Sequence, residues 1–426
     1  MNFTDLGLAA PILKALQDEG YVTPTPIQRE AIPSVLAGSD LLGIAQTGTG
    51  KTAAFALPIL HRLTADRRQP LRKGSRVLVL SPTRELASQI AESFRVYGRH
   101  LGISVAVVFG GVAYSPQVKA LSRGVDVLVA TPGRLLDHVE QGTIDLKGTE
   151  ILVLDEADQM LDLGFVKPIR RIVSNTSNRR QSLFFSATMP REIATLADQL
   201  LRDPVRVAVT PVASTAERVS QRVIQVESSR KRALLVELLA DTTMERTLIF
   251  TRTKRGADRV ARHLEENSIP ASAIHGNKSQ RQREQALYDF RKSHIRVLVA
   301  TDIASRGIDI DGVSHVVNFE LPEVPEAYVH RIGRTARAGA SGRAISLCAA
   351  EEQDLLRSIE RLTRQTIERE DRRNDTRLAT SAAEEPRARH RPDRSERNRS
   401  DGHPQRRQQR RSGGGPRRNS RGRAAA

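Results

Sequence analysis

Short runs of apolar and β-branched residues recur along the first half of the chain, and longer stretches of mixed polarity separate them. These runs cover residues 40–44, 76–80, 104–109, 125–130, 150–154 and 182–185. Most of their positions are apolar without strict alternation, as expected of strands that are buried on both faces. Such strands, separated by helical stretches, are typical of βα units on a parallel sheet.

The same pattern stops and then returns in the second half. Around residues 205–218 it lapses into Thr, Pro, Ala and Ser, and it resumes at 222–226, 246–250, 296–300, 315–319 and 343–347. A chain of 426 residues also exceeds the size at which single cores usually stop growing, about 250–300 residues. We therefore predict an α/β protein with a first domain at 1–207, a linker at 208–218 and a second domain at 219–368.

The last segment, residues 369–426, has a different composition. Residues 371–426 hold 17 Arg and no Lys, against 7 Asp and Glu, and they contain no aromatic residue. Such a segment cannot bury a core, so we predict a disordered basic tail. The whole chain carries 67 Lys and Arg against 49 Asp and Glu. This excess indicates a polyanionic partner, and nucleic acid is favoured over an acidic membrane surface.

Three features predict a cytoplasmic protein. No apolar run approaches the roughly 18 residues that a membrane span needs. The first twenty residues mix Asp5, Lys14 and Asp18 among their apolar positions, unlike a signal peptide. A single cysteine, Cys348, cannot form an internal disulfide or a thiolate zinc site. Membrane partners are therefore not expected.

A glycine-rich segment follows the first predicted strand and precedes an apolar helix. It consists of Ala45, Gln46, Thr47, Gly48, Thr49, Gly50, Lys51 and Thr52. Glycines let backbone N–H groups surround phosphates, Lys51 is suited to the β and γ oxygens, and the Thr52 hydroxyl is suited to Mg²⁺. The segment predicts a nucleotide-binding loop, and a simple glycine turn is the alternative.

Acidic residues follow the strand predicted at 150–154. Asp155 and Glu156 would lie at the carboxyl end of this buried strand, where α/β sheets bind their ligands. There Asp155 is suited to the Mg²⁺ shell and Glu156 to polarising an attacking water. The alternative is a helix N-terminus that merely favours acidic residues.

With these two elements in place, the chain resembles the DEAD-box family of RNA helicases, whose motifs appear in family order over about residues 1–365. The resemblance implies two tandem RecA-like parallel-sheet domains that use ATP and Mg²⁺. Asn277 and Ala336 depart from the common family residues and resemble the bacterial RhlE-like branch. Ser305 is a third small departure, and none of the three affects a catalytic assignment.

The resemblance assigns further residues to ATP. The segment 20–28 resembles the family's Q motif, which implies that Tyr21 stacks on adenine and Gln28 reads its amino edge. Asp309 is assigned to the ribose side of ATP. Arg334 and Arg337 are assigned as arginine fingers, which complete a catalytic set with Lys51, Asp155 and Glu156. Taken alone, Tyr21 would be an ordinary aromatic and Gln28 an ordinary helix residue.

The remaining motifs are assigned to coupling and to RNA. Coupling of hydrolysis to strand separation is assigned to Asp158, Ser186, Thr188 and His330. Contacts to the RNA backbone are assigned to Pro82, Thr83, Arg84, Gly111, Thr131, Pro132, Gly133, Arg134, Arg252, Gly276, Thr301 and Arg306. Hydroxyl groups, glycine amides and arginines at loop and helix starts bind phosphates without reading bases. Taken singly, the Gly-Gly and Thr-Pro-Gly-Arg segments are more often plain turns.

The resemblance implies an ATP-dependent RNA helicase, with RNA-stimulated ATP hydrolysis coupled to local, non-processive unwinding or to remodelling of RNA–protein complexes. RNA, as a single strand or duplex, would be bound with little sequence preference. We expect a monomer, with ribosome precursors or RNA-decay machinery as candidate partners.

Two alternative functions are a processive DNA translocase and a non-hydrolysing RNA clamp. The Q motif argues against the first. The second is disfavoured by four intact residues, Lys51, Glu156, Arg334 and Arg337. The tail is hypothesised to tether RNA, with a solubilising appendage as the alternative.

Overall fold

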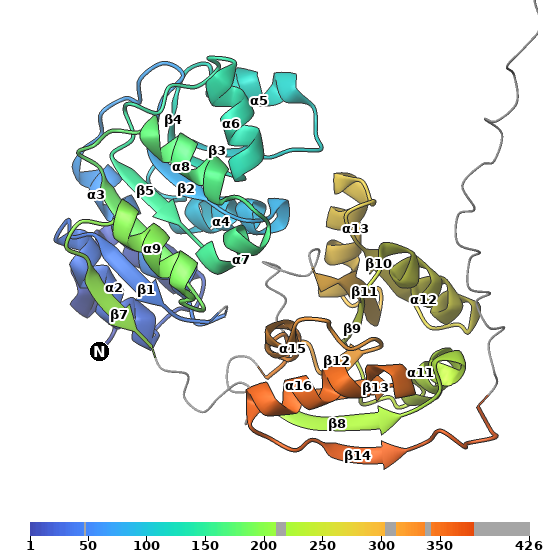
Figure 1. Ribbon diagram of the computed structural model, residues 1–426. Coiled ribbons are helices and arrows are strands. Elements are labelled where there is room, and N and C mark those ends of the chain that lie inside the picture. Colours follow the sequence, from blue (N-terminus) through green and yellow to red (C-terminus); the bar gives the residue numbers. More distant parts are fainter. Residues whose placement is uncertain (47, 210–218, 303–311, 337–341, 379–426) are drawn as a thin grey trace, which may run out of the picture. The chain divides into compact units, whose positions relative to one another are not determined.

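The structure is a computed structural model, and it describes residues 1–46, 48–209, 219–302, 312–336 and 342–378 (Figure 1). Each half of the chain forms a seven-stranded sheet in which all paired strands are parallel. This architecture agrees with the predicted α/β class.

In the first domain the strand order is β3-β4-β2-β5-β6-β1-β7. The strands are β1 Leu41–Ile44, β2 Ser75–Leu80, β3 Val105–Val108, β4 Val125–Ala130, β5 Ile151–Leu154, β6 Gln181–Ser186 and β7 Val205–Ala208. The helices are α1 Ala10–Asp18, α2 Pro26–Leu36, α3 Lys51–Ala65, α4 Arg84–Tyr97, α5 Tyr114–Leu121, α6 Pro132–Glu140, α7 Ala157–Asp162, α8 Val166–Ser174 and α9 Arg191–Leu200, after a short 3-10 helix, Phe3–Leu6.

Both faces of this sheet are buried. Val153 belongs to the hydrophobic cluster on one face, with residues of α1 to α4, whereas its neighbours Leu152 and Leu154 belong to the cluster on the other face, with residues of α6 to α9. Successive side chains of a strand point to opposite faces, so a strand covered on both sides needs apolar residues at consecutive positions. This is why the first-half runs lack polar alternation.

The second domain repeats the layout, with strand order β10-β11-β9-β12-β13-β8-β14. The strands are β8 Val219–Gln225, β9 Thr247–Thr251, β10 Ala271–Ile274, β11 Val297–Thr301, β12 His315–Asn318, β13 Gly342–Cys348 and β14 Glu368–Asp371. The helices are α11 Lys231–Leu239, α12 Lys254–Glu266, α13 Gln280–Arg291, α15 Pro325–Ile332 and α16 Gln353–Thr363, with short 3-10 helices at Ser228–Arg230 and Ala350–Glu352.

The end of the second domain differs from the prediction. The sequence placed residues 369–378 in the tail, whereas the structure places them on the second domain. Strand β14 pairs with β8, and Leu378 is buried in the hydrophobic cluster that contains Leu234. Arg372 anchors this segment, because its guanidinium forms two hydrogen bonds of 3.0 Å with the Glu237 carboxylate. The predicted tail from residue 379 onward lies outside the described residues.

Strand β7 ends at Ala208 and β8 begins at Val219, while most of the predicted linker, residues 210–218, lies outside the described residues. Within the described ranges, none of the helices has the length and apolar character needed to cross a membrane.

Candidate active site

The glycine-rich loop connects β1 to α3 and depends on two glycines. Gly48 and Gly50 have φ angles of +83° and +93°, which place them in the left-handed region. A Cβ at Gly50 would also overlap the Gln28 side-chain amide. Only glycine fits both requirements, so the loop can fold closely over the start of α3. Thr47 lies outside the described residues.

Lys51 begins α3 and is only 5% exposed. Within the described part of the chain its Nζ is buried and has no hydrogen-bond partner. Burying an ammonium group without a hydrogen-bond partner is costly, so an anion that accepts its hydrogen bonds would be bound favourably. A phosphate group at the loop meets that requirement, because the N-terminus of α3 also favours negative charge.

Asp155 and Glu156 follow β5 directly and are each 2% exposed. Glu156 has a φ of +53°, and its backbone N–H donates to Asp155 Oδ1 at 3.0 Å. The pKa of Asp155 is raised to about 7: burial raises it, the charge of Lys51 opposes this shift, and the charge of Glu156 adds to it. A divalent cation beside Asp155 would favour the ionised carboxylate, so this donor fits the predicted Mg²⁺ site together with Thr52.

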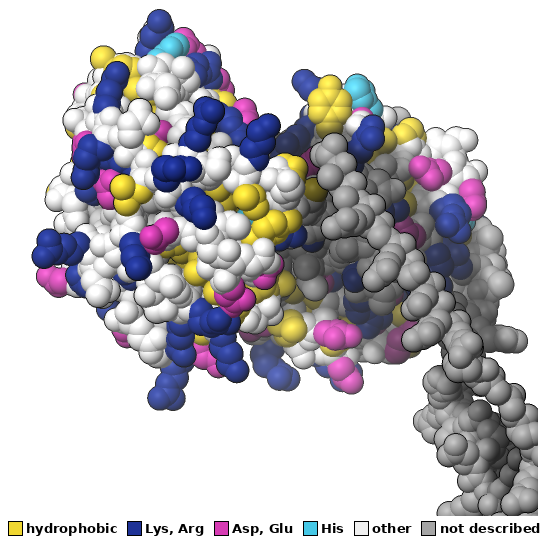
Figure 2. All heavy atoms as spheres, turned by 90° about the horizontal axis from the view of Figure 1, so that it is seen from above, with side chains coloured by type: hydrophobic (Ala, Val, Ile, Leu, Met, Phe, Trp, Pro, Cys, Tyr) yellow, Lys and Arg dark blue, Asp and Glu magenta, His cyan; other side chains and the backbone are white. Residues whose placement is uncertain are grey.

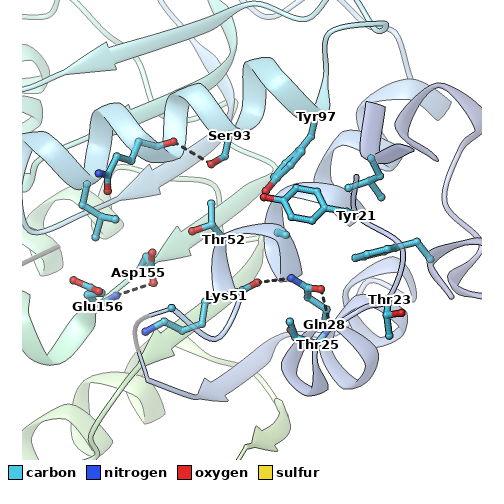
Figure 3. Close-up of a pocket in the computed structure, with 17 residues that line it drawn as sticks. Tyr21, Thr23, Thr25, Gln28, Lys51, Thr52, Ser93, Tyr97, Asp155 and Glu156 are labelled. Carbon is cyan, nitrogen blue, oxygen red and sulfur yellow. Dashed lines mark hydrogen bonds between the residues drawn. The ribbon is translucent and has the colours of Figure 1, made fainter. Parts of the chain in front are cut away.

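These elements line one cavity of about 370 Å³ (Figure 3). Its volume is within the usual range of small-molecule sites, about 300–1,000 Å³. Lys51, Asp155 and Glu156 lie toward one end, and Tyr21 and Tyr97 lie side by side at the other. The cavity therefore combines a phosphate-binding end with an aromatic end.

Around the cavity the structure adds contacts of Tyr21 and Gln28 that the sequence did not predict. Tyr21 is 50% exposed and packs edge-on against Tyr97, with ring centroids 6.3 Å apart. Gln28 accepts from the Thr25 backbone N–H at 2.9 Å and donates to the Gly50 carbonyl at 3.1 Å. The Gln28 amide thus links the start of α2 to the phosphate loop.

Asp158 contacts the segment 186–188, whose Ser186 and Thr188 are assigned with it to coupling. Asp158 Oδ2 accepts from both the backbone N–H and the hydroxyl of Thr188, each at 3.0 Å. The Ser186 hydroxyl accepts from the Asp158 backbone N–H at 3.3 Å. These bonds connect the residues after β5 to the end of β6, and their role in coupling stays a prediction.

The predicted RNA-binding residues of the first domain gather at one sheet edge. They follow the carboxyl ends of β2, β3 and β4, which are neighbours in the sheet. Thr83 caps α4 by accepting from the Leu86 N–H at 3.2 Å. Gly111 has a φ of +77°, and a Cβ there would overlap the Arg84 guanidinium. Pro82 lies just before α4, and Thr131 is the N-cap of α6, whose first residues are Pro132, Gly133 and Arg134.

The second domain places its predicted residues in the same way. Arg252, Gly276 and Thr301 stand at or just after the carboxyl ends of the neighbouring strands β9, β10 and β11. Arg334 is 6% exposed, and its Nε donates to the His330 carbonyl at 3.3 Å. Arg306, Asp309 and Arg337 lie outside the described residues.

Sequence reasoning did not single out Arg331, which is 1% exposed. Its guanidinium donates to both carboxylate oxygens of Asp302, at 2.6 and 2.7 Å, and to the Glu320 carbonyl at 2.7 Å. It therefore ties α15 to the end of β11. Arg331 lies in a segment with other arginines that were predicted to be functional. Nothing in the local sequence distinguishes it from them as a buried, structural arginine.

Comparison with known proteins gives consistent matches. The family described as DEAD/DEAH box helicase matches residues 25–196, and the helicase conserved C-terminal domain matches residues 230–339. The chain is 45% identical over 367 residues to the ATP-dependent RNA helicase DeaD of Mycobacterium tuberculosis, covering 86% of this chain and 64% of that protein. It is 42% identical to CshA of Limosilactobacillus reuteri, covering 85% of this chain and 72% of that protein.

Among solved structures, Saccharomyces cerevisiae Dbp5 bound to RNA and ADP BeF3 is similar, with a TM-score of 0.77 and 30% identity. The match covers 87% of this chain and 95% of the Dbp5 chain. The chain spans about six tenths of the length of the DeaD proteins, 64% of the mycobacterial and 58% of the Escherichia coli one. Because these matches cover 86–87% of this chain, the similarity extends through both sheet domains.

Proposed function

Because the chain belongs to the DEAD-box family of ATP-dependent RNA helicases, we propose that it hydrolyses ATP in response to RNA and uses this reaction to separate short RNA duplexes locally or to remodel RNA–protein complexes. One observation carries the proposal. The buried Lys51 ammonium lies in one cavity with the Asp155 and Glu156 carboxylates and the Gln28 amide. A nucleoside triphosphate supplies the anion and the base that this cavity suits.

The protein groups have separate tasks in the proposed reaction. Lys51 binds the β- and γ-phosphate oxygens, and Glu156 orients the attacking water and accepts its proton. Thr52 and Asp155 would hold Mg²⁺, which when bound neutralises charge on the phosphates. Arg334 and Arg337 stabilise the charge that develops on the transferred phosphoryl group. Tyr21 and Gln28 select adenine.

RNA and ATP bind cooperatively in this proposal. The two sheet domains close on both ligands, so each ligand strengthens the binding of the other by linkage. RNA is held through its sugar-phosphate backbone by the loops that carry Arg84, Gly111, Arg134, Arg252 and Thr301, so binding shows little sequence preference. In the closed state the bound single strand is bent, and a bent strand cannot remain part of a continuous duplex. ATP hydrolysis then reopens the domains and releases the RNA.

Several finer points belong to the same proposal. We place the chain in the RhlE-like branch because of Asn277 and Ala336, although the relatives compared above are DeaD and CshA proteins. The proposed setting is the cytoplasm, where the protein acts as a monomer. Its proposed targets are ribosome precursors or RNAs under decay, since a backbone-binding site accepts many structured RNAs.

The decisive experiment measures phosphate release from ATP with and without a single-stranded RNA oligonucleotide. RNA should stimulate the wild type. Lys51→Ala should lose ATP affinity and lower turnover by about 100-fold or more, because it removes the phosphate contact. Glu156→Gln should keep ATP affinity, lose turnover, and accumulate with ATP on RNA.

Lys147→Ala is the matched control, because Lys147 is an exposed lysine of the same domain. It should leave both binding and turnover unchanged. Normal turnover by Glu156→Gln would contradict the role of Glu156. A wild-type ATPase that ignores RNA would contradict the helicase function itself.

A further inference from the structure

One aromatic side chain beside the RNA-binding edge of the first domain belongs to none of the motifs. Tyr114 begins α5, and its ring is stacked on His138 with centroids 4.2 Å apart and planes 10° from parallel. The same ring lies 5.6 Å from Cζ of Arg134, within the distance of a cation–π interaction. Tyr114 therefore connects a buried histidine to an arginine that is predicted to bind RNA.

The Thr143 hydroxyl contacts both members of this stack. It donates to the His138 carbonyl at 3.0 Å and lies 2.8 Å from His138 Nδ1 and 3.1 Å from Tyr114 Oη. A hydroxyl has one hydrogen, so donation to the carbonyl leaves its oxygen to accept from both other groups. The proton of His138 is then assigned to Nδ1.

The geometry favours a neutral imidazole at His138, because its Nε2 is buried and has no hydrogen-bond partner among the described residues. Its residue is fully buried, and burial lowers the pKa of His138, with the charge of Arg134 adding to the shift and Asp137 opposing it. A neutral ring can lie flat against Tyr114 without repelling the nearby guanidinium. The stack thus forms a fixed, uncharged support.

Arg134 carries the effect of this support to the neighbouring loop. Its Nη1 and Nη2 both donate to the Val112 carbonyl, at 3.3 and 3.4 Å, and its side chain is only 14% exposed. The preceding residue, Gly111, lies against the Arg84 guanidinium. Contacts therefore run from Tyr114 through Arg134 and Val112 to all three predicted RNA-binding loops of this domain. Figure 2 shows Lys and Arg side chains spread over the face of the first domain that is seen from above.

We infer that Tyr114 is a positioning residue for RNA binding, whose ring, supported by His138, holds the Arg134 guanidinium in the arrangement that receives an RNA phosphate. This inference rests on the proposed function, since Arg134 acts on RNA only if the protein binds RNA there. Tyr114 belongs to neither hydrophobic cluster of the domain. Its partners are a charged group, a neutral imidazole and a hydroxyl, so core packing does not account for it.

The physical reason is the entropy of a long side chain. An arginine that must be ordered on binding loses rotamer freedom and therefore affinity, whereas one that is already held does not. Arg84 and Arg134 also carry like charges close together, and burial lowers the pKa of Arg84, with Arg134 contributing to the shift. Holding both guanidinium groups in place prepares the edge for a phosphate anion.

The test measures the RNA concentration that gives half-maximal ATPase stimulation. Tyr114→Leu should raise this concentration about fivefold, because it removes the π face next to Arg134. The turnover number at saturating RNA and the KM for ATP should stay unchanged. Tyr114→Phe keeps the ring and should remain close to the wild type. Tyr288→Leu is the control, because this exposed tyrosine also packs against a histidine, His294.

A double-variant cycle separates positioning from general destabilisation. In an Arg134→Ala background, Tyr114→Leu should add less than about twofold, because its effect acts through Arg134. The inference would be overturned if Tyr114→Leu raised the half-maximal RNA concentration by the same factor with and without Arg134. It would also be overturned if Tyr114→Leu changed only the turnover number or the thermal stability. If Tyr114→Leu does not fold, Tyr114→Met takes its place, since it fills similar space without a π face. A wild type that RNA fails to stimulate would instead overturn the proposed function.

Discussion

At the scale of single residues, the site depends on charges that the fold isolates from water. Asp155 shows this most clearly, because burial raises the pKa of its carboxyl to about 7. In the nucleotide-free protein this carboxyl is protonated below pH 7 and ionised above it. Its folded-state pKa exceeds the unfolded value, so its contribution to stability is fully present below about pH 4 and falls as the pH rises to about 7.

This shift predicts a pH dependence of metal-assisted nucleotide binding. Mg²⁺ binds the ionised carboxylate, so Mg²⁺-dependent ATP affinity should rise with pH and level off above about 7. Between pH 8 and pH 6 the affinity should fall about tenfold, since one proton competes with the metal. Isothermal titration at several pH values, with buffers of different ionisation enthalpy, measures both the affinity and the protons released.

Asp155→Asn provides the control for this measurement, because the phosphates of ATP titrate in the same range. The pH dependence of ATP affinity that remains in the variant arises from the nucleotide. The difference in pH dependence between the wild type and the variant arises from Asp155. Equal proton release by the wild type and the variant would show that Asp155 is already ionised before Mg²⁺ binds.

Sequence motifs predicted the residues that have a distinctive local pattern, and the structure brings Lys51, Asp155 and Glu156 together in one cavity. Residues such as Tyr97 and Arg331 carry no such pattern. Tyr97 ends an ordinary amphipathic helix, and it lines the cavity only because α4 packs beside the Q-motif segment. Such contacts arise from tertiary packing, which a linear pattern does not contain.

At the scale of elements, the strands that the sequence missed share one property. Strands β7, β10 and β14 each lie at an edge of a sheet, whereas the interior strands were all predicted. An edge strand is paired on one side only and is less buried, so it needs fewer apolar residues. Three of the four β14 side chains are exposed, which explains why Glu368–Asp371 looks like part of a polar tail.

The position of β14 leads to a prediction about the domain's end. A chain that stops after Ile367 loses β14, the Arg372–Glu237 ion pair and the buried Leu378. Burial of one leucine contributes about 1.5–3 kcal/mol, so the melting temperature should fall by roughly 5–10 °C. A chain that stops after Leu378 should melt like the full chain in differential scanning calorimetry.

Leu378→Ala in the full chain is the matched variant, and it should reproduce a substantial part of this loss. If both truncated chains melt at the same temperature, residues 368–378 do not stabilise the second domain. The comparison requires no RNA or ATP, so its result is independent of the proposed function.

At the scale of the whole molecule, the predicted RNA contacts follow the corresponding three strands in each of the two sheets. In each sheet the first three strands by position, β3, β4 and β2 or β10, β11 and β9, are followed by predicted RNA contacts. In the first domain the next three, β5, β6 and β1, are followed by residues of the coupling segment and the nucleotide site. Parallel strands collect their carboxyl ends at one edge, so each domain presents adjoining surfaces for its ligands.

The arginine-rich segment gives the last prediction. Residues 379–426 contain 14 Arg against 5 Asp and Glu and hold none of the predicted catalytic residues. Guanidinium groups stay charged at any physiological pH and bind phosphates bidentately. Each phosphate neutralised on a single strand contributes about −0.7 to the slope of log K against log salt, so six engaged arginines would contribute about −4.

Deleting residues 379–426 should therefore weaken RNA binding most at low salt and flatten this slope. ATP turnover at saturating RNA should be nearly unchanged, because the segment only tethers RNA. Filter-binding titrations over about 50–200 mM salt measure the slope. Replacing the 14 arginines by lysine should preserve most of it, whereas replacement by glutamine should match the deletion. If the deletion changes neither affinity nor slope, the segment acts as a solubilising appendage, because counterion release from RNA cannot occur without phosphate contacts.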